Sequence, residues 1–135
     1  MIVKHIKYTD YDGNVREEDF YFNLNKAEIS EMELSEAGGY SKMLEKLQTS
    51  PDVPKIMAIF KDIILKSYGI KSDDGKRFIK SEQLSKEFTE TEAYSELFME
   101  IGSDPEKAKE FIVGILPADM RQQVAGEVKK LEEAK

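Results

Sequence analysis

Few residues of this chain could carry out chemistry by themselves. His5 is the only histidine among 135 residues, and there is no cysteine. A site with two histidine ligands, a thiolate metal site, a disulfide and a cysteine nucleophile are therefore impossible. A phosphate-binding loop is also missing, because the stretch KSDDGKRFIKS at 71–81 has one glycine and no GKS or GKT sequence. We therefore expect neither enzymatic activity nor a cofactor.

The stretch Asp10-Tyr11-Asp12-Gly13-Asn14 contains the carboxylate and amide oxygens that calcium prefers as ligands. A calcium loop of the EF-hand type needs glycine at its sixth position and glutamate at its twelfth. Here the glycine comes two positions too early, and Tyr21 stands at the twelfth position. This mismatch predicts a turn and no metal site.

A run of acidic residues is the third feature whose side chains could take part in chemistry. Paired carboxylates can act in acid–base catalysis, but no nucleophile or substrate-binding motif accompanies them here. The run predicts a solvated helix face, or else an acidic docking surface. Residues 87–106 carry seven acidic groups and no basic one, namely Glu87, Glu90, Glu92, Glu96, Glu100, Asp104 and Glu106.

The composition indicates a globular protein that carries many charges. Hydrophobic residues make up 40% and charged residues 35% of the chain, and 13 phenylalanines and tyrosines (seven and six) argue against disorder. The formal net charge of −7 argues against a nucleic-acid or anionic-membrane surface. We expect no signal peptide, because MIVKHIKY has no apolar core region, and no membrane span, because no apolar run approaches the necessary length. The absence of cysteine fits a reducing cytoplasm.

One helix over residues 55–68 organises the chain. Its apolar positions have helical spacing. The charged residues Lys55, Asp62 and Lys66 form only a narrow polar stripe that would face solvent. A helix that is apolar most of the way round is a core helix. The spaced positions are Ile56, Ile59, Phe60, Ile63 and Ile64.

The N-terminal residues 2–24 predict a β-hairpin. Alternation places Ile2, Ile6 and Tyr8 on one face of the first strand and Phe20, Phe22 and Leu24 on one face of the second. A two-residue turn at Asp12-Gly13 would set Ile6 opposite Asp19. We therefore expect a three-residue loop at 12–14, with Gly13 or Asn14 left-handed, which sets Ile6 opposite Phe20 and Asp10 opposite Arg16.

Helix signals fill the rest of the chain. They predict an α+β, predominantly α-helical fold: an N-terminal β-hairpin followed by about six mostly short helices around the central helix 55–68. We expect residues 1–117 to form one globular domain, with hairpin 2–24 and helical part 25–117, and 118–135 to form a partly frayed amphipathic helix. The signals are an Asn25–Glu28 capping box with a stop at Gly38-Gly39, a short helix at 40–47, a cap at Ser81, a Thr89–Glu92 capping box, Pro105 at a helix start and the break at Pro117.

Residues 68–81 predict a connecting loop. Gly69 can end the central helix, Asp73-Asp74-Gly75 predicts a turn, and the apolar pair Phe78-Ile79 would pin the loop to the core. The segment 71–80 has four basic and two acidic residues. A solvated connector and a partner-contacting loop are both consistent with this pattern.

The central segment carries a family resemblance. YGIKSDDGKRFIKS at 68–81 and FTETEAYSELFMEI at 88–101 resemble the tail assembly chaperones of long-tailed bacteriophages and related prophages. EMELSEAGGYS at 31–41 and PKIMAIFKDIILKSYG at 54–69 fit the layout of that family. The resemblance covers most of the chain, from about residue 24 to Leu116-Pro117.

The resemblance implies a protein that binds the tape-measure protein, keeps it soluble and recruits tail-tube subunits during tail assembly. It also implies action in the bacterial host cytoplasm and absence from the mature virion. Many members of the family also exist in a longer, frameshifted form. The alternative is a structural tail component retained in the particle, and the protein content of purified particles separates the two.

We expect the contact surface in the basic loop and the acidic helix of the resembling segment. Self-association through the hairpin edge or the last helix is a further expectation. The candidate partner-binding residues are Tyr68, Lys71, Lys76, Arg77, Phe78, Lys80, Glu92, Tyr94, Glu96 and Met99.

Overall fold

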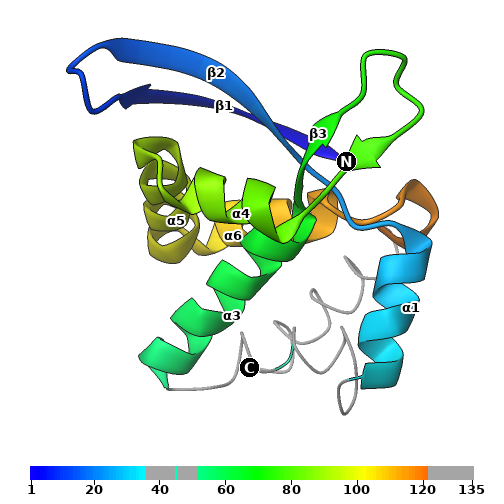
Figure 1. The fold of residues 1–135 in the computed structure, drawn as a ribbon. Coiled ribbons are helices and arrows are strands. Elements are labelled where there is room, and N and C mark those ends of the chain that lie inside the picture. Colours follow the sequence, from blue (N-terminus) through cyan, green and yellow to red (C-terminus); the bar gives the residue numbers. More distant parts are fainter. Residues whose placement is uncertain (36–44, 46–51, 122–135) are drawn as a thin grey trace.

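The fold is α+β and rich in helix, as the sequence predicts. The computed structural model describes residues 1–35, 45 and 52–121. Its sheet has the strand order β1-β2-β3-β4, and Figure 1 shows the long β1–β2 hairpin lying above helices α4, α5 and α6. The elements are β1 Ile2–Thr9, β2 Val15–Phe22, α1 Lys26–Ser35, α3 Val53–Ser67, β3 Tyr68–Lys71, β4 Phe78–Ile79, α4 Glu82–Thr89, α5 Glu92–Ser103 and α6 Pro105–Gly114.

The first hairpin has the expected faces but a different register. Ile6 lies opposite Glu18, and Ile2 lies opposite Phe22, so the expected pairing is wrong by two residues. A shift of two residues keeps each side chain on its face. Ile6 and Phe22 are therefore buried as the alternation predicts.

The turn of this hairpin explains the shift. The three-residue loop is Tyr11–Gly13 instead of 12–14, because the Asp10 carboxylate accepts hydrogen bonds from Asp12 N and Asn14 N, each at 2.9 Å. Asp10 N also donates to Asn14 O, which sets these two residues opposite each other. Gly13 takes the left-handed conformation with φ +84°. Arg16 Nε donates to the same carboxylate at 2.6 Å and holds the pKa of Asp10 below its usual value.

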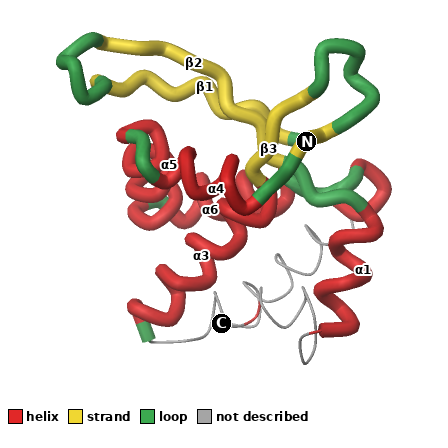
Figure 2. The backbone as a smooth tube through the Cα atoms, in the orientation of Figure 1, coloured by secondary structure: helices red, strands yellow, loops and turns green. Residues whose placement is uncertain are grey.

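Residues 68–81 form a second hairpin, so the prediction of a simple connecting loop is wrong. Tyr68 pairs with Phe22 and Gly69 with Tyr21, which adds β3 to the edge of β2 (Figure 2). At the junction, Asn23 N donates to Ser67 O at 2.8 Å and joins the end of α3 to the end of β2. The expected turn is present, and its Gly75 has φ +74°.

Side-chain caps define the helix starts. Asn25 and Glu28 form the predicted capping box, since Glu28 N donates to Asn25 Oδ1 and Asn25 N donates to Glu28 Oε1. Ser81 caps α4 as predicted. The predicted cap at Thr89 is wrong: Thr91 caps α5 and accepts from Tyr94 N, whereas Thr89 lies in the last turn of α4.

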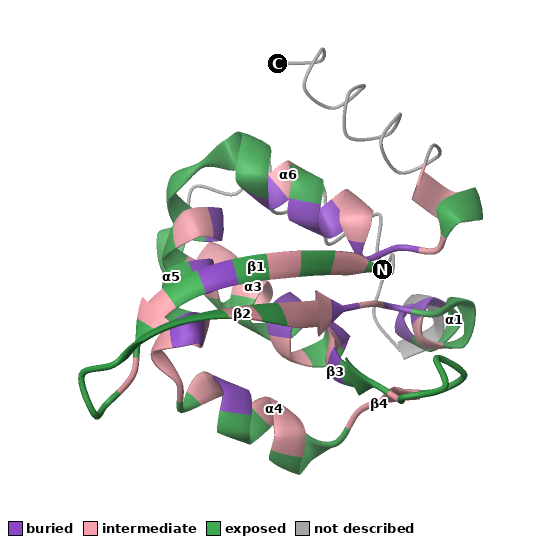
Figure 3. Cartoon of the chain, turned by 90° about the horizontal axis from the view of Figure 1, so that it is seen from above, coloured by how far each residue is buried: buried purple, intermediate pink, exposed green. Residues whose placement is uncertain are grey.

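The core is formed by buried residues of the first hairpin and of the helices, which are purple in Figure 3. The predicted core faces of α5 and α6 supply Leu97, Ile101, Phe111 and other buried residues. The central helix is a core helix only in its C-terminal half. Its buried residues are Ile63, Ile64 and Ser67, whereas Ile56, Ile59 and Phe60 are half-buried and Val53 is exposed.

Some predictions fall outside the described residues. These are the stop at Gly38-Gly39, the short helix at 40–47 apart from residue 45, and the apolar stripe Val124, Val128 and Leu131 of the last helix. Within the part of the chain that the structure describes, no helix meets the length and hydropathy needed to cross a membrane.

Candidate functional site

The turn between β3 and β4 presents a basic tip formed by Lys71, Lys76 and Arg77. Asp74 orders this turn, because its carboxylate accepts from Lys76 N at 3.0 Å and from Ser72 Oγ at 2.7 Å. These bonds hold the pKa of Asp74 below its usual value. All three basic residues are exposed, and the Lys71 ammonium lies 5.9 Å from the centre of the Tyr21 ring.

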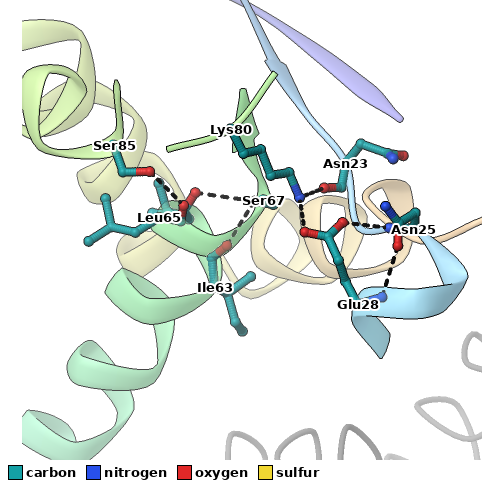
Figure 4. A network of polar contacts seen from close by, with 9 residues as sticks. Asn23, Asn25, Glu28, Ile63, Leu65, Ser67, Lys80 and Ser85 are labelled. Atoms are coloured by element: carbon teal, nitrogen blue, oxygen red, sulfur yellow. Dashed lines mark hydrogen bonds and ion pairs between the residues drawn. The ribbon is translucent and has the colours of Figure 1, made fainter. Parts of the chain in front are cut away.

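Lys80, another predicted site residue, has a structural role in the fold. Its ammonium donates to Glu28 Oε2 and to Asn23 O, both at 2.6 Å (Figure 4). The lysine and glutamate side chains are only 21% and 29% exposed, so water screens this pair less than a surface pair. Lys80 therefore ties β4 to the start of α1, and we leave it out of the candidate contact surface.

The aromatic candidates Tyr68 and Tyr94 belong to a ring cluster around Phe88. The Tyr68 ring stacks on Phe88 with centroids 4.3 Å apart, and Tyr94 meets Phe88 edge-on at 5.7 Å. Burial raises the pKa of both tyrosines. Phe78 is half-buried against Gly69. These three predicted site residues therefore stabilise the fold.

The outer face of α5, defined here by Ser95, Glu96, Met99, Gly102 and Ser103, is exposed. The Met99 side chain is 65% exposed, and the Sδ and Cε atoms of Met57 from α3 lie close to Gly102. The exposed residues recur every three to four positions, so they form one continuous helical face.

Glu92, the remaining predicted site residue, lies beside the first hairpin. Its carboxylate accepts a hydrogen bond from the Tyr11 hydroxyl at 2.8 Å. Figure 1 shows the β3–β4 turn and α5 on opposite sides of the molecule. The structure therefore does not bring the ten predicted site residues together: the basic tip and the outer face of α5 are separate surfaces.

The sequence analysis missed a groove of about 630 Å³ between α3 and α4. Four lysines line it, Lys61 and Lys66 from α3 and Lys80 and Lys86 from the α4 side, against two carboxylates. These lysines are spread over 26 positions of the sequence, and they come together only because α3 and α4 pack beside each other. No local sequence pattern therefore indicates this site.

The outer face of the first hairpin carries the single histidine. His5 Nδ1 lies 2.8 Å from Asp19 Oδ1, and Nε2 lies 3.4 Å from Glu17 Oε2. The hydrogen bond to Asp19, followed by that to Glu17, raises the pKa of His5. Among the described residues, no cluster of three or more histidine, aspartate or glutamate side chains could hold a metal ion.

An NMR titration is expected to give His5 a pKa above its ordinary value of about 6.5. Because the folded pKa is raised, the pairing contributes stability that is fully present below the unfolded pKa and is lost as pH rises through the folded pKa. Asp19→Asn should lower the pKa more than Glu17→Gln, since Asp19 is the stronger cause. A wild-type His5 that titrates at or below the ordinary value would contradict this geometry.

The fold and these surfaces define a small, helix-rich α+β protein with a sheet built from two hairpins and separate charged surfaces. A family model described as phage tail assembly chaperone matches residues 1–135. The chain belongs to this family, as its resembling segments predict. Comparison with the curated proteins and with the solved structures finds no match.

Proposed function

We propose that this tail assembly chaperone binds the tape-measure protein in the host cytoplasm, keeps it soluble and recruits tail-tube subunits. Membership of the family supports a role with protein partners in tail assembly. The observation that carries the proposal is the outer face of α5, where Met99 stays 65% exposed. An exposed methionine is flexible and polarisable, so it can adapt to the apolar side chains of a protein partner.

The chemistry of this face suits an amphipathic client helix. Met99 and the neighbouring Met57 are flexible and polarisable, so they can adapt to different apolar side chains. Ser95, Gly102 and Ser103 are small and allow a second helix to approach closely. Glu96 adds negative charge at the edge. The proposed client segment is therefore a helix with an apolar stripe and a basic flank.

The basic tip supplies a second contact in this proposal. A protein that recruits one partner to another needs two separate surfaces, one for each partner, that can be occupied at the same time. The β3–β4 turn, which carries the tip, and α5 lie on opposite sides of the molecule (Figure 1). We assign the tape-measure protein to the outer face of α5 and the tail-tube protein to the tip formed by Lys71, Lys76 and Arg77.

Co-expression with the tape-measure protein tests this function. We expect the tape-measure protein to become soluble and to co-purify, and Met99→Glu to weaken capture by about tenfold or more, the scale of an interface hot spot. Lys76→Glu/Arg77→Glu should retain the tape-measure protein and lose the tail-tube protein. Circular dichroism checks that both variants fold, since all three side chains are exposed.

Two results would overturn the proposal. In the first, the tape-measure protein stays insoluble and unbound in the presence of the wild-type chain. In the second, purified phage particles contain the chain in stoichiometric amounts, which would identify a structural component of the tail. Equal capture by Met99→Glu and the wild type would remove the outer face of α5 from the proposal.

A further inference from the structure

The groove between α3 and α4 has polar walls and one apolar contact. Ser85 Oγ of α4 donates to Leu65 O of α3 at 3.0 Å, so the two helices approach closely at this small side chain (Figure 4). Leu65 is the apolar residue that lines the groove, and it is half-buried, whereas Lys61 and Lys86 are exposed. The groove therefore offers an apolar contact with one exposed cation from each helix beside it.

Two of the four groove lysines are engaged in ion pairs. Lys66 pairs with Asp62 at 2.9 Å, and Lys80 takes part in the half-buried pair described above. Within the described ranges, Lys61 and Lys86 form no ion pair. In a chain of net charge −7, the groove is therefore a locally basic site, and it favours an acidic occupant.

The polar groups of the groove suit carboxylates better than a phosphate group. Among the described residues that line the groove, none is an arginine, whose planar fork binds phosphate through two parallel hydrogen bonds. At the start of α4, Ser81 Oγ already accepts from Leu84 N, and Glu82 adds negative charge. The beginning of this helix therefore does not complete a phosphate site.

Leu65 sets a second requirement for the occupant. A purely ionic ligand would leave this side chain without an apolar contact, whereas an apolar group placed over it gains free energy from burial. A peptide segment can supply carboxylates and an apolar side chain a few residues apart. A nucleic acid does not suit the groove, because a duplex would also meet the strongly acidic remainder of the chain.

We propose that the groove between α3 and α4 binds an acidic peptide segment of another protein. Carboxylates of the segment lie at Lys61 and Lys86, and one apolar side chain between them packs over Leu65. This surface shares no residue with the outer face of α5 or with the basic tip. It selects an acidic segment, whereas we assign a helix with a basic flank to the outer face of α5; this contrast rests on the proposed function, and the chemistry of the groove does not.

Fluorescence anisotropy with two labelled synthetic peptides and the purified full-length chain tests this chemistry. The first peptide has glutamates on both sides of one leucine, and in the second a serine replaces the leucine. We expect the first peptide to bind, and the second to bind about fivefold or more weakly, because the burial of the leucine is lost.

Reversing the charge of the groove tests where the first peptide binds. Lys61→Glu/Lys86→Glu should raise its dissociation constant about tenfold or more, because like charges then meet. Both side chains are exposed, and circular dichroism checks that the variant folds. In the wild type, the amide NMR signals of Leu65 and Ser85 should shift when the first peptide is added.

Lys55→Glu/Lys107→Glu is the matched control. Both lysines are exposed and lie outside the groove, at the start of α3 and on α6. This variant changes the net charge as much as the groove variant does, so it measures the general attraction between the chain and an acidic peptide. Its affinity for the first peptide should equal that of the wild type.

Four results would overturn the proposal. These are no binding of the first peptide to the wild type, an equal loss of affinity in the groove variant and the control, equal affinities of the two peptides, and displacement of the first peptide by an equal concentration of inorganic tripolyphosphate. The last two would identify a small anion as the occupant. Because neither tail protein is present in this assay, its outcome and the outcome of the pull-down are independent of each other.

Discussion

Phe88→Ala is expected to cost about 3–5 kcal/mol of the free energy of unfolding, the usual range for a buried phenylalanine. Phe88 is 2% exposed and contacts the rings of Phe20, Phe22, Tyr68 and Tyr94. These rings come from β2, from the start of β3 and from α5, so Phe88 joins the sheet to the helices. Because domains of this size have about 5–15 kcal/mol of total stability, the variant loses a large fraction of it.

Urea unfolding followed by circular dichroism measures this loss. Phe88→Leu is the matched control, because leucine fills more of the space and should recover part of the lost stability. It cannot restore the ring contacts, so a deficit should remain. A loss below about 1 kcal/mol for Phe88→Ala would contradict the central position of this ring in the core.

Gly69→Ala is the second substitution with a large expected effect. An added Cβ atom would lie 2.6 Å from Cε2 of the Phe78 ring and 2.8 Å from Ile79 O. The carbonyl belongs to β4, whose Ile79 pairs with Ile70, so it cannot move without disturbing the second hairpin. We expect a loss of about 1–3 kcal/mol from this overpacking.

The melting temperature and the amide NMR signals of 68–80 report this change. Gly102→Ala is the control, because its Cβ would meet only the flexible end of Met57, at 3.4 Å or more. Alanine also favours the helix over glycine by up to about 1 kcal/mol. The melting temperature of Gly102→Ala should therefore equal or exceed that of the wild type. Equal melting temperatures for Gly69→Ala and the wild type would show that β3 and β4 do not pack as described.

Several features of this protein follow from the sequence by itself, because they depend on neighbours along the chain. Alternation assigned Ile6 and Phe22 to the buried face of the first hairpin, and a shift by two residues leaves such a face unchanged. The Asn25–Glu28 capping box and the cap at Ser81 involve residues within three positions of each other. The resembling segments at 68–101 indicated the family that the family model shows.

Other features were decided only by the tertiary structure. The register of the first hairpin depends on the hydrogen bonds of Asp10, and β3 forms because the edge of β2 is free to pair with Tyr68 and Gly69. The same folding engages Lys80 with Glu28, 52 positions away, and separates the basic tip from α5. The α3–α4 groove gathers four lysines in the same way. Sequence patterns report which face a side chain takes, whereas pairing and grooves depend on contacts between distant segments.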